Sequence, residues 1–305
     1  MREASARSCA QRRSTGEDAM PRVTADGIET RYERHGEGPT LLMFAPGGFD
    51  ANLQRWSTGS TWRAMRAMEV LPRRFTTIIY DRRESGDSGG RIETLSWAGY
   101  ARQARDLLHQ IGEESAIVLG ACMGCSIATA FAAAYPEATR SVILHWPVGG
   151  HVWNEMGHER FGEAIRFART AGMPAVAERA AASASFWSDP ASGPWASCAA
   201  RDAGFARQLA ETPVERYLAF LRTSELSLFG GDLIGGVHAS EIQSIRQPVL
   251  IVPGGDEVHT RSSAYAIGEL LANVELWDVP VASQESVELL RRISAFRDAT
   301  AGASS

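Results

Sequence analysis

The chain has 305 residues, of which 44% are hydrophobic and 22% charged, and its formal net charge is -5. This composition is typical of a soluble globular protein that buries one core, with or without an inserted cap, and needs no metal or disulfide support. Every basic residue is an arginine, which excludes mechanisms that need a lysine Schiff base, and the arginines form no basic stripe suited to nucleic acid.

The ends and the cysteines of the sequence point to no membrane or metal partner. No apolar run approaches the ~20 residues of a membrane span, and the first 20 residues lack the hydrophobic centre of a secretory signal, so we expect a cytoplasmic protein. The polar residues 1–20 precede the first patterned segment and are predicted to form a disordered leader. The four cysteines are scattered, and the nearest pair, Cys122 and Cys125, falls within a different motif, so we expect no metal site.

Short apolar runs alternate with helical patterns along most of the chain. The runs predict strands over residues 41–45, 76–80, 116–119, 141–145, 249–252 and 274–277. Helices are predicted over 97–111, capped by Ser96, and over 123–135, ended by Pro136. This alternation is typical of βαβ units, and it predicts an α/β fold with a mostly parallel sheet flanked by helices.

The alternation breaks once, over residues 148–245. This segment has helical patterns, over 159–170 and 213–226, but no convincing strand. We therefore predict a core made of residues 21–147 and 246–300, with 148–245 inserted as a helical cap.

One short motif contains the candidate nucleophile. Residues 120–124 read Gly-Ala-Cys-Met-Gly and lie directly between a predicted strand and a predicted helix, which is the form of a nucleophile elbow with cysteine in place of serine. The strained turn presents Cys122 at the N-terminus of the helix, where unpaired N–H groups and the helix dipole favour an anion. Cys125, one turn later, is expected to pack against the sheet.

On these residues the chain resembles the α/β-hydrolase family over residues 23–296. Residues 44–49 resemble the oxyanion loop after the third strand, 80–89 the turn after the fourth, and 247–256 the seventh strand with its acid loop. The resemblance implies that Asp256 is the acid of a catalytic triad. It also implies an oxyanion site formed by the backbone N–H groups of Met123 and of Gly48 or Phe49.

The sequence departs from the family at the catalytic histidine. The family places it after the eighth strand, but residues 279–285 contain no histidine, and the last histidine of the chain is His259. Two residues could supply the base from the same edge of the sheet. His145 ends a predicted strand and could equally be a core histidine, while His259 follows Asp256 by three residues and could instead only brace the acid loop.

The leading hypothesis is an enzyme that uses Cys122 on an ester, thioester or activated carbonyl of an apolar small molecule, by acyl transfer, cyclisation or hydrolysis. Without the late histidine we expect slow hydrolysis and a preference for transfer. The alternatives are a lyase, isomerase or cyclase on the same fold, and a catalytically silent binding protein; an engineered Cys122 also stays open. No nucleotide-binding motif is present, so no cofactor is expected. Candidate substrate contacts are Trp146, Trp153 and Trp187.

Overall fold

The computed structural model describes residues 20–58, 60–183, 185–230 and 237–301. The predicted leader, residues 1–20, therefore lies outside the described residues except for Met20, which is exposed. Within the described residues, no helix combines the length and the apolar character needed to cross a bilayer.

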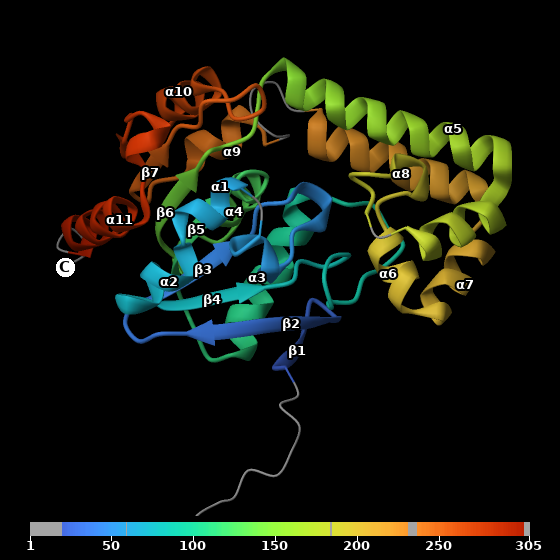
Figure 1. Cartoon of the computed structure of the whole chain (residues 1–305), viewed down its shortest axis with the longest axis horizontal. Helices are drawn as coiled ribbons and strands as arrows, with labels where there is room; N and C mark the ends of the chain where they lie inside the picture. Colours follow the sequence, from blue (N-terminus) through green and yellow to red (C-terminus); the bar gives the residue numbers. More distant parts are fainter. Residues whose placement is uncertain (1–19, 59, 184, 231–236, 302–305) are drawn as a thin grey trace, which may run out of the picture.

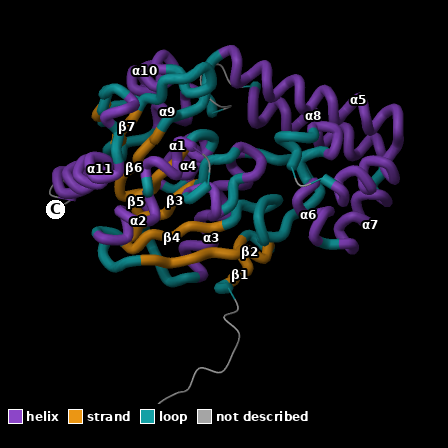
Figure 2. Tube along the Cα trace, in the orientation of Figure 1, coloured by secondary structure: helices purple, strands orange, loops and turns teal. Residues whose placement is uncertain are grey.

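An eight-stranded sheet forms the centre of the molecule (Figure 2). Its order is β1-β2-β4-β3-β5-β6-β7-β8, with β1 and β2 antiparallel to their neighbours and β3 to β8 mutually parallel. The strands are β1 (Arg22–Ala25), β2 (Ile28–His35), β3 (Thr40–Phe44), β4 (Thr76–Tyr80), β5 (Ala116–Ala121), β6 (Thr139–His145), β7 (Val249–Val252) and β8 (Val274–Leu276). All six predicted strands are present, and the mostly parallel α/β fold is confirmed.

The central strands of the sheet are buried on both faces, which explains their uninterrupted apolar runs. In β3, Leu42 and Phe44 belong to the hydrophobic core on one face, while Leu41 and Met43 belong to the core on the other. This alternation follows from the two-residue repeat of a strand, and a strand covered on both sides has no polar face.

Helices cover the two faces. The larger core includes side chains of α3 (Trp97–Gln110), α4 (Gly124–Ala134), α9 (Ala239–Ser244) and α10 (Arg261–Leu270). The smaller core, on the other face, includes side chains of α1 (Ser60–Met65), α2 (Ala67–Val70) and α11 (Ser286–Ala301). The hydroxyl oxygen of Ser96 accepts the N–H of Gly99, so the expected cap of α3 is present.

Among the described residues between β6 and β7, every regular element is helical. They are α5 (His151–Ala182), α6 (Ala196–Arg201), α7 (Ala203–Glu211), α8 (Val214–Phe229) and α9. Figure 1 shows α5 to α8 together at one side of the sheet, whereas α9 contacts α4 and α10. The segment α5 is broken at Gly172, whose φ is 78°, just before Pro174. This break explains why the helical pattern ends near residue 170.

Candidate active site

The turn between β5 and α4 has the backbone of an elbow. Cys122 has a φ of 54°, in the left-handed region, and its side chain is partly exposed. A Cβ on Gly120 would lie 2.4 Å from the carbonyl oxygen of Gly124, and a Cβ on Gly124 would lie 2.3 Å from that of Phe44, so both positions require glycine. The Cys122 N–H donates to the carbonyl oxygen of His145 at 3.1 Å. These contacts hold the thiol at the carboxyl edge of the sheet.

Cys125 occupies a different environment from Cys122. Its thiol is buried and donates to the carbonyl oxygen of Gly120 at 3.1 Å. Burial raises the pKa of the Cys125 thiol well above its ordinary value. Cys125 is therefore part of the packing beneath the elbow, as its position in the sequence indicates.

The loop after β7 brings Asp256 and His259 together. The Nδ1 atom of His259 lies 2.8 Å from each carboxylate oxygen of Asp256. The same carboxylate accepts the backbone N–H groups of Val258, at 3.0 Å, and of His259, at 2.9 Å. Burial opposes the charge of Asp256, but the hydrogen bonds from the His259 ring and from the backbone prevail and lower the pKa of the carboxyl group.

The ring of His259 also lies close to Cys122. Burial disfavours the imidazolium, but the interactions with the Cys122 sulfur and with the Asp256 carboxylate outweigh it and raise the pKa of His259 to about 9. The Nε2 atom nevertheless makes no hydrogen bond of regular geometry with any described residue. Hydrogen bonds of catalytic groups often form or tighten only when a ligand binds.

His145, the other candidate base, has a buried ring between two indoles. Its ring centroid lies 5.3 Å from that of Trp62 and 5.9 Å from that of Trp146, with which it stacks. Neither ring nitrogen has a hydrogen-bond partner among the described residues. Burial, and then the nearby His259, lower the pKa of His145 to about 3, so its imidazole is neutral. Only its backbone carbonyl supports the elbow.

The loop after β3 is shaped for backbone hydrogen bonding. Gly47 and Gly48 have φ values of 114° and 60°. The guanidinium of Arg82 donates to the carbonyl oxygens of Gly48, at 2.9 Å, and of Phe49, at 3.0 Å. In a trans peptide the N–H points opposite to the C=O, so the Phe49 N–H points away from Arg82. Neither this N–H nor that of Met123 donates to another described backbone group.

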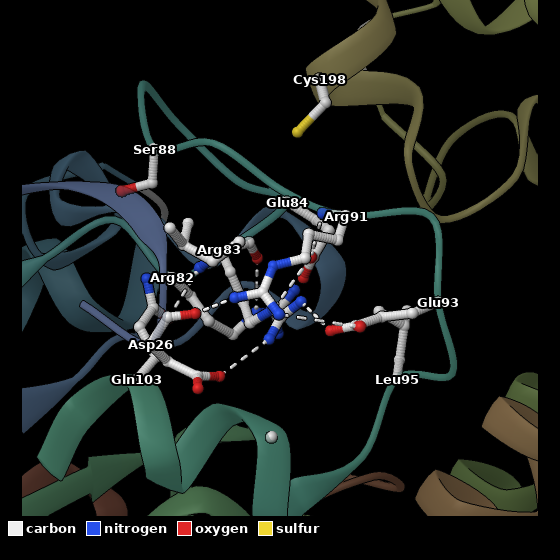
Figure 3. Close-up of polar contacts among 12 residues, drawn as sticks. Asp26, Arg82, Arg83, Glu84, Ser88, Arg91, Glu93, Leu95, Gln103 and Cys198 are labelled. Atoms are coloured by element: carbon white, nitrogen blue, oxygen red, sulfur yellow. Dashed lines mark hydrogen bonds and ion pairs between the residues drawn. The ribbon is translucent and has the colours of Figure 1, made fainter. Parts of the chain in front are cut away.

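Arg82 is a buried cation in the turn after β4 (Figure 3). Its guanidinium carbon lies 4.3 Å from the ring centroid of Tyr100, and no ion pair joins it to a carboxylate of the described residues. Its neighbour Arg83 pairs with Glu84 at 3.0 Å, and the Arg83 N–H donates to Gln103 at 2.9 Å. These partners fix the turn and leave Arg82 free to bind the loop after β3.

The side chain of Phe49 points into a cluster of aromatic rings from the helical segment. Its ring centroid lies 4.8 Å from that of Phe186, 5.8 Å from that of Phe161 and 6.4 Å from that of Phe229. All four side chains are buried. The loop after β3 is therefore packed directly against the helices inserted after β6.

Two of the candidate substrate-contact residues lie beside this loop. Trp187 is partly exposed, and a Cβ on Gly48 would lie 3.2 Å from its indole. Trp153 stacks on Trp187 with centroids 5.9 Å apart, but it is only 2% exposed. The guanidinium of Arg160 lies 3.9 Å from the centroid of the Trp187 ring. Of the two tryptophans, Trp187 is thus the one with accessible surface.

Two residues of this region were not identified from the sequence. Arg82 lies two residues after the end of the buried strand β4, and the charged residues at this strand end are the signal that could have found it. Gln284 lies in the loop that lacks a histidine, where it accepts the indole N–H of Trp146 at 2.6 Å. Within the described residues, no group of three or more His, Cys, Asp or Glu side chains could hold a metal ion.

Comparison with known proteins places the chain in a family. Residues 40–282 match the family described as alpha/beta hydrolase fold. A dihydrolipoyllysine-residue acetyltransferase component of the acetoin cleaving system of Cupriavidus necator is 26% identical over 238 residues, which cover 76% of this chain and 56% of that protein. The chain thus spans about half the length of that relative.

Solved structures show the same fold at low sequence identity. The enol-lactonase from Burkholderia xenovorans LB400 has a TM-score of 0.58 at 18% identity, over 91% of this chain and 100% of that one. An esterase from Thermogutta terrifontis has a TM-score of 0.58 at 19% identity, over 92% and 98% of the two chains. Since the family match spans most of the sequence, the chain belongs to the α/β-hydrolase fold family.

Proposed function

We propose that this protein is a cysteine-dependent hydrolase or acyltransferase that acts on an ester, thioester or similarly activated carbonyl of an apolar small molecule. The observation that carries the proposal is the arrangement at the carboxyl edge of the sheet. The Asp256 carboxylate binds one nitrogen of His259, and the same imidazole is close enough to Cys122 for that residue to raise its pKa. This is the order of groups in an acid–base–nucleophile triad.

In the first step, the thiolate of Cys122 attacks the carbonyl carbon and the oxygen becomes an oxyanion. The N–H groups of Met123 and Phe49 are the donors for that oxygen, since both lack another backbone acceptor among the described residues. The His259 imidazolium, whose pKa is about 9, then gives its proton to the leaving group. The carbon–heteroatom bond breaks and a thioester on Cys122 remains.

The second step needs a base, and His259 is then neutral. It can take a proton from water or from an acceptor alcohol, amine or thiol as that molecule attacks the thioester. The new bond forms at the carbonyl carbon, the bond to sulfur breaks, and the thiolate–imidazolium pair is restored. The absence of a histidine from residues 279–285 predicts slow hydrolysis, and a base at His259 would supply the proton transfer that this loop lacks.

An apolar substrate is supported by the surroundings of the oxyanion loop. Trp187 lies against Gly48 with part of its indole exposed, next to the buried ring of Trp153. Aromatic surface beside a few well-placed polar groups is typical of small-molecule sites.

The proposal can be tested with an aryl ester. Stopped-flow kinetics would follow its turnover, and intact-mass spectrometry would detect an acyl group on Cys122. His259→Asn should accumulate one acyl group on Cys122 and release it slowly, because general-base catalysis contributes typically 10²–10⁴-fold. Cys122→Ala should form no adduct. His145→Phe should turn over at close to the wild-type rate, since the ring nitrogens of His145 hydrogen-bond to none of the described residues and phenylalanine keeps a ring against Trp146. Wild-type turnover by His259→Asn, or by Cys122→Ala, would contradict the proposal.

A further inference from the structure

The loop after β8 carries a buried glutamine in the segment where the family has its histidine. Gln284 is only 4% exposed. Its Nε2 donates to the carbonyl oxygens of Pro253, at 3.0 Å, and of Val279, at 3.3 Å, while its Oε1 accepts the indole N–H of Trp146 at 2.6 Å. This one side chain therefore joins the segments that follow β6, β7 and β8.

Trp146 has a backbone conformation that bulky residues seldom adopt. Its φ is 55°, in the left-handed region. Its N–H donates to the carbonyl oxygen of Val252 at 2.8 Å, and its indole N–H donates to Gln284. Strained residues persist where the surroundings fix them, and they concentrate at functional sites.

The indole of Trp146 packs beside the imidazole of His259. The two ring centroids lie 5.7 Å apart, with an interplanar angle of 54°. A Cβ on Gly254 would lie 2.5 Å from the Cβ of His259 and 3.3 Å from the indole of Trp146, so the three residues are in close contact. The side chain of Asp256, by contrast, is 50% exposed.

We propose that Trp146 and Gln284 are positioning residues that hold the imidazole of His259 between Asp256 and Cys122. The inference rests on the proposed function, in which His259 takes the role of the family's late histidine. It names the residues that keep His259 in position. Asp256, whose side chain is half-exposed, binds only the Nδ1 edge of the ring. The indole of Trp146 packs beside the ring, and Gln284 holds the indole in place. The loop after β8 thus contributes to the site through contact with the base.

Two variants separate positioning from mere packing. Gln284→Met removes both hydrogen-bonding groups, and Trp146→Phe keeps a ring but removes the indole N–H. Each should lower kcat about tenfold with little change in KM, because small misplacement of a catalytic group has effects of this order or larger. Each should also lower the pKa of the His259 ring, measured by NMR, because the ring moves away from Cys122. The double variant should be no slower than the worse single one.

A control outside the site is Thr77→Val. Thr77 is also buried, and its hydroxyl donates to the carbonyl oxygen of His35 at 3.1 Å near the start of β4, at the end of the strand opposite the site. This variant should unfold more easily yet leave kcat and the titration of His259 unchanged.

Wild-type kcat and an unchanged His259 titration in folded Trp146→Phe and Gln284→Met would overturn the inference. If Gln284→Met does not fold, Trp146→Phe decides alone. If Trp146→Phe and Gln284→Met behave like the wild type while His259→Asn loses turnover, the proposed function stands. Only the positioning role of Trp146 and Gln284 is then refuted. Wild-type turnover in His259→Asn would refute the proposed function itself.

Discussion

Replacing His145 with phenylalanine should make the protein less sensitive to acid. The folded state holds this imidazole neutral, with a pKa of about 3, whereas the unfolded chain binds a proton near pH 6.5. Between these values the unfolded state binds more protons, so stability falls as the pH falls. The loss is about 1.4 kcal/mol for each pH unit below 6.5, or about 2 kcal/mol near pH 5. His145→Phe removes this loss.

Urea unfolding of both proteins near pH 7.5 and near pH 5, followed by circular dichroism, measures the effect. His259 has the opposite sign: its pKa of about 9 stabilises the fold fully below pH 6.5, and this contribution is lost as the pH rises through about 9. It is present in both proteins and cancels in the comparison. We expect the acid-induced loss to be about 2 kcal/mol larger in the wild type. Equal losses would show that the His145 ring reaches solvent and would refute the reasoning.

Three further predictions concern catalysis. The kcat/KM for an ester should fall above about pH 9, because His259 then lacks the proton that the leaving group needs, and a flat profile to about pH 10 would contradict this role. Iodoacetamide should alkylate Cys122 much faster than the buried Cys125, and equal rates in peptide mapping would remove Cys122 as the nucleophile. Arg82→Met should lower kcat about tenfold or more at nearly constant KM, since the oxyanion loop loses the donor that orients it, and an unchanged kcat would show that the loop needs no such donor.

The central parallel strands were predictable because burial on both faces leaves a visible sequence pattern. β3 to β7 follow from such runs, whereas the short β8 is largely exposed, and the elbow follows from two glycines that flank Cys122 at a fixed spacing. The antiparallel β1 and β2 carry charged side chains, so no apolar run marks them. Arg31 of β2, for instance, pairs with Asp87 in a distant turn at 2.7 Å. Pairing of that kind depends on tertiary structure and leaves no local pattern.

The choice between two histidines could not be made from the sequence. His145 ends β6 and His259 lies in the loop after β7, and both strands end at one edge of the sheet. The difference lies in the direction of each ring: His145 points between two indoles, whereas His259 turns back onto Asp256 within one loop. The contact between Gln284 and Trp146 was equally hidden, because it joins residues 138 positions apart.

The packing of Phe49 links the movement of the helical segment to the catalytic geometry. Its backbone N–H belongs to the proposed oxyanion site, while its ring is buried against Phe161, Phe186 and Phe229. Helices α5 and α8 therefore cannot lift away from the sheet as a rigid lid without pulling this ring with them or exposing it to water. An opening that pulls the ring would displace the Phe49 N–H from the proposed oxyanion site, and closing over the substrate would return it. Reactivity at the thiol would then be gated by the same motion that shields it from solvent.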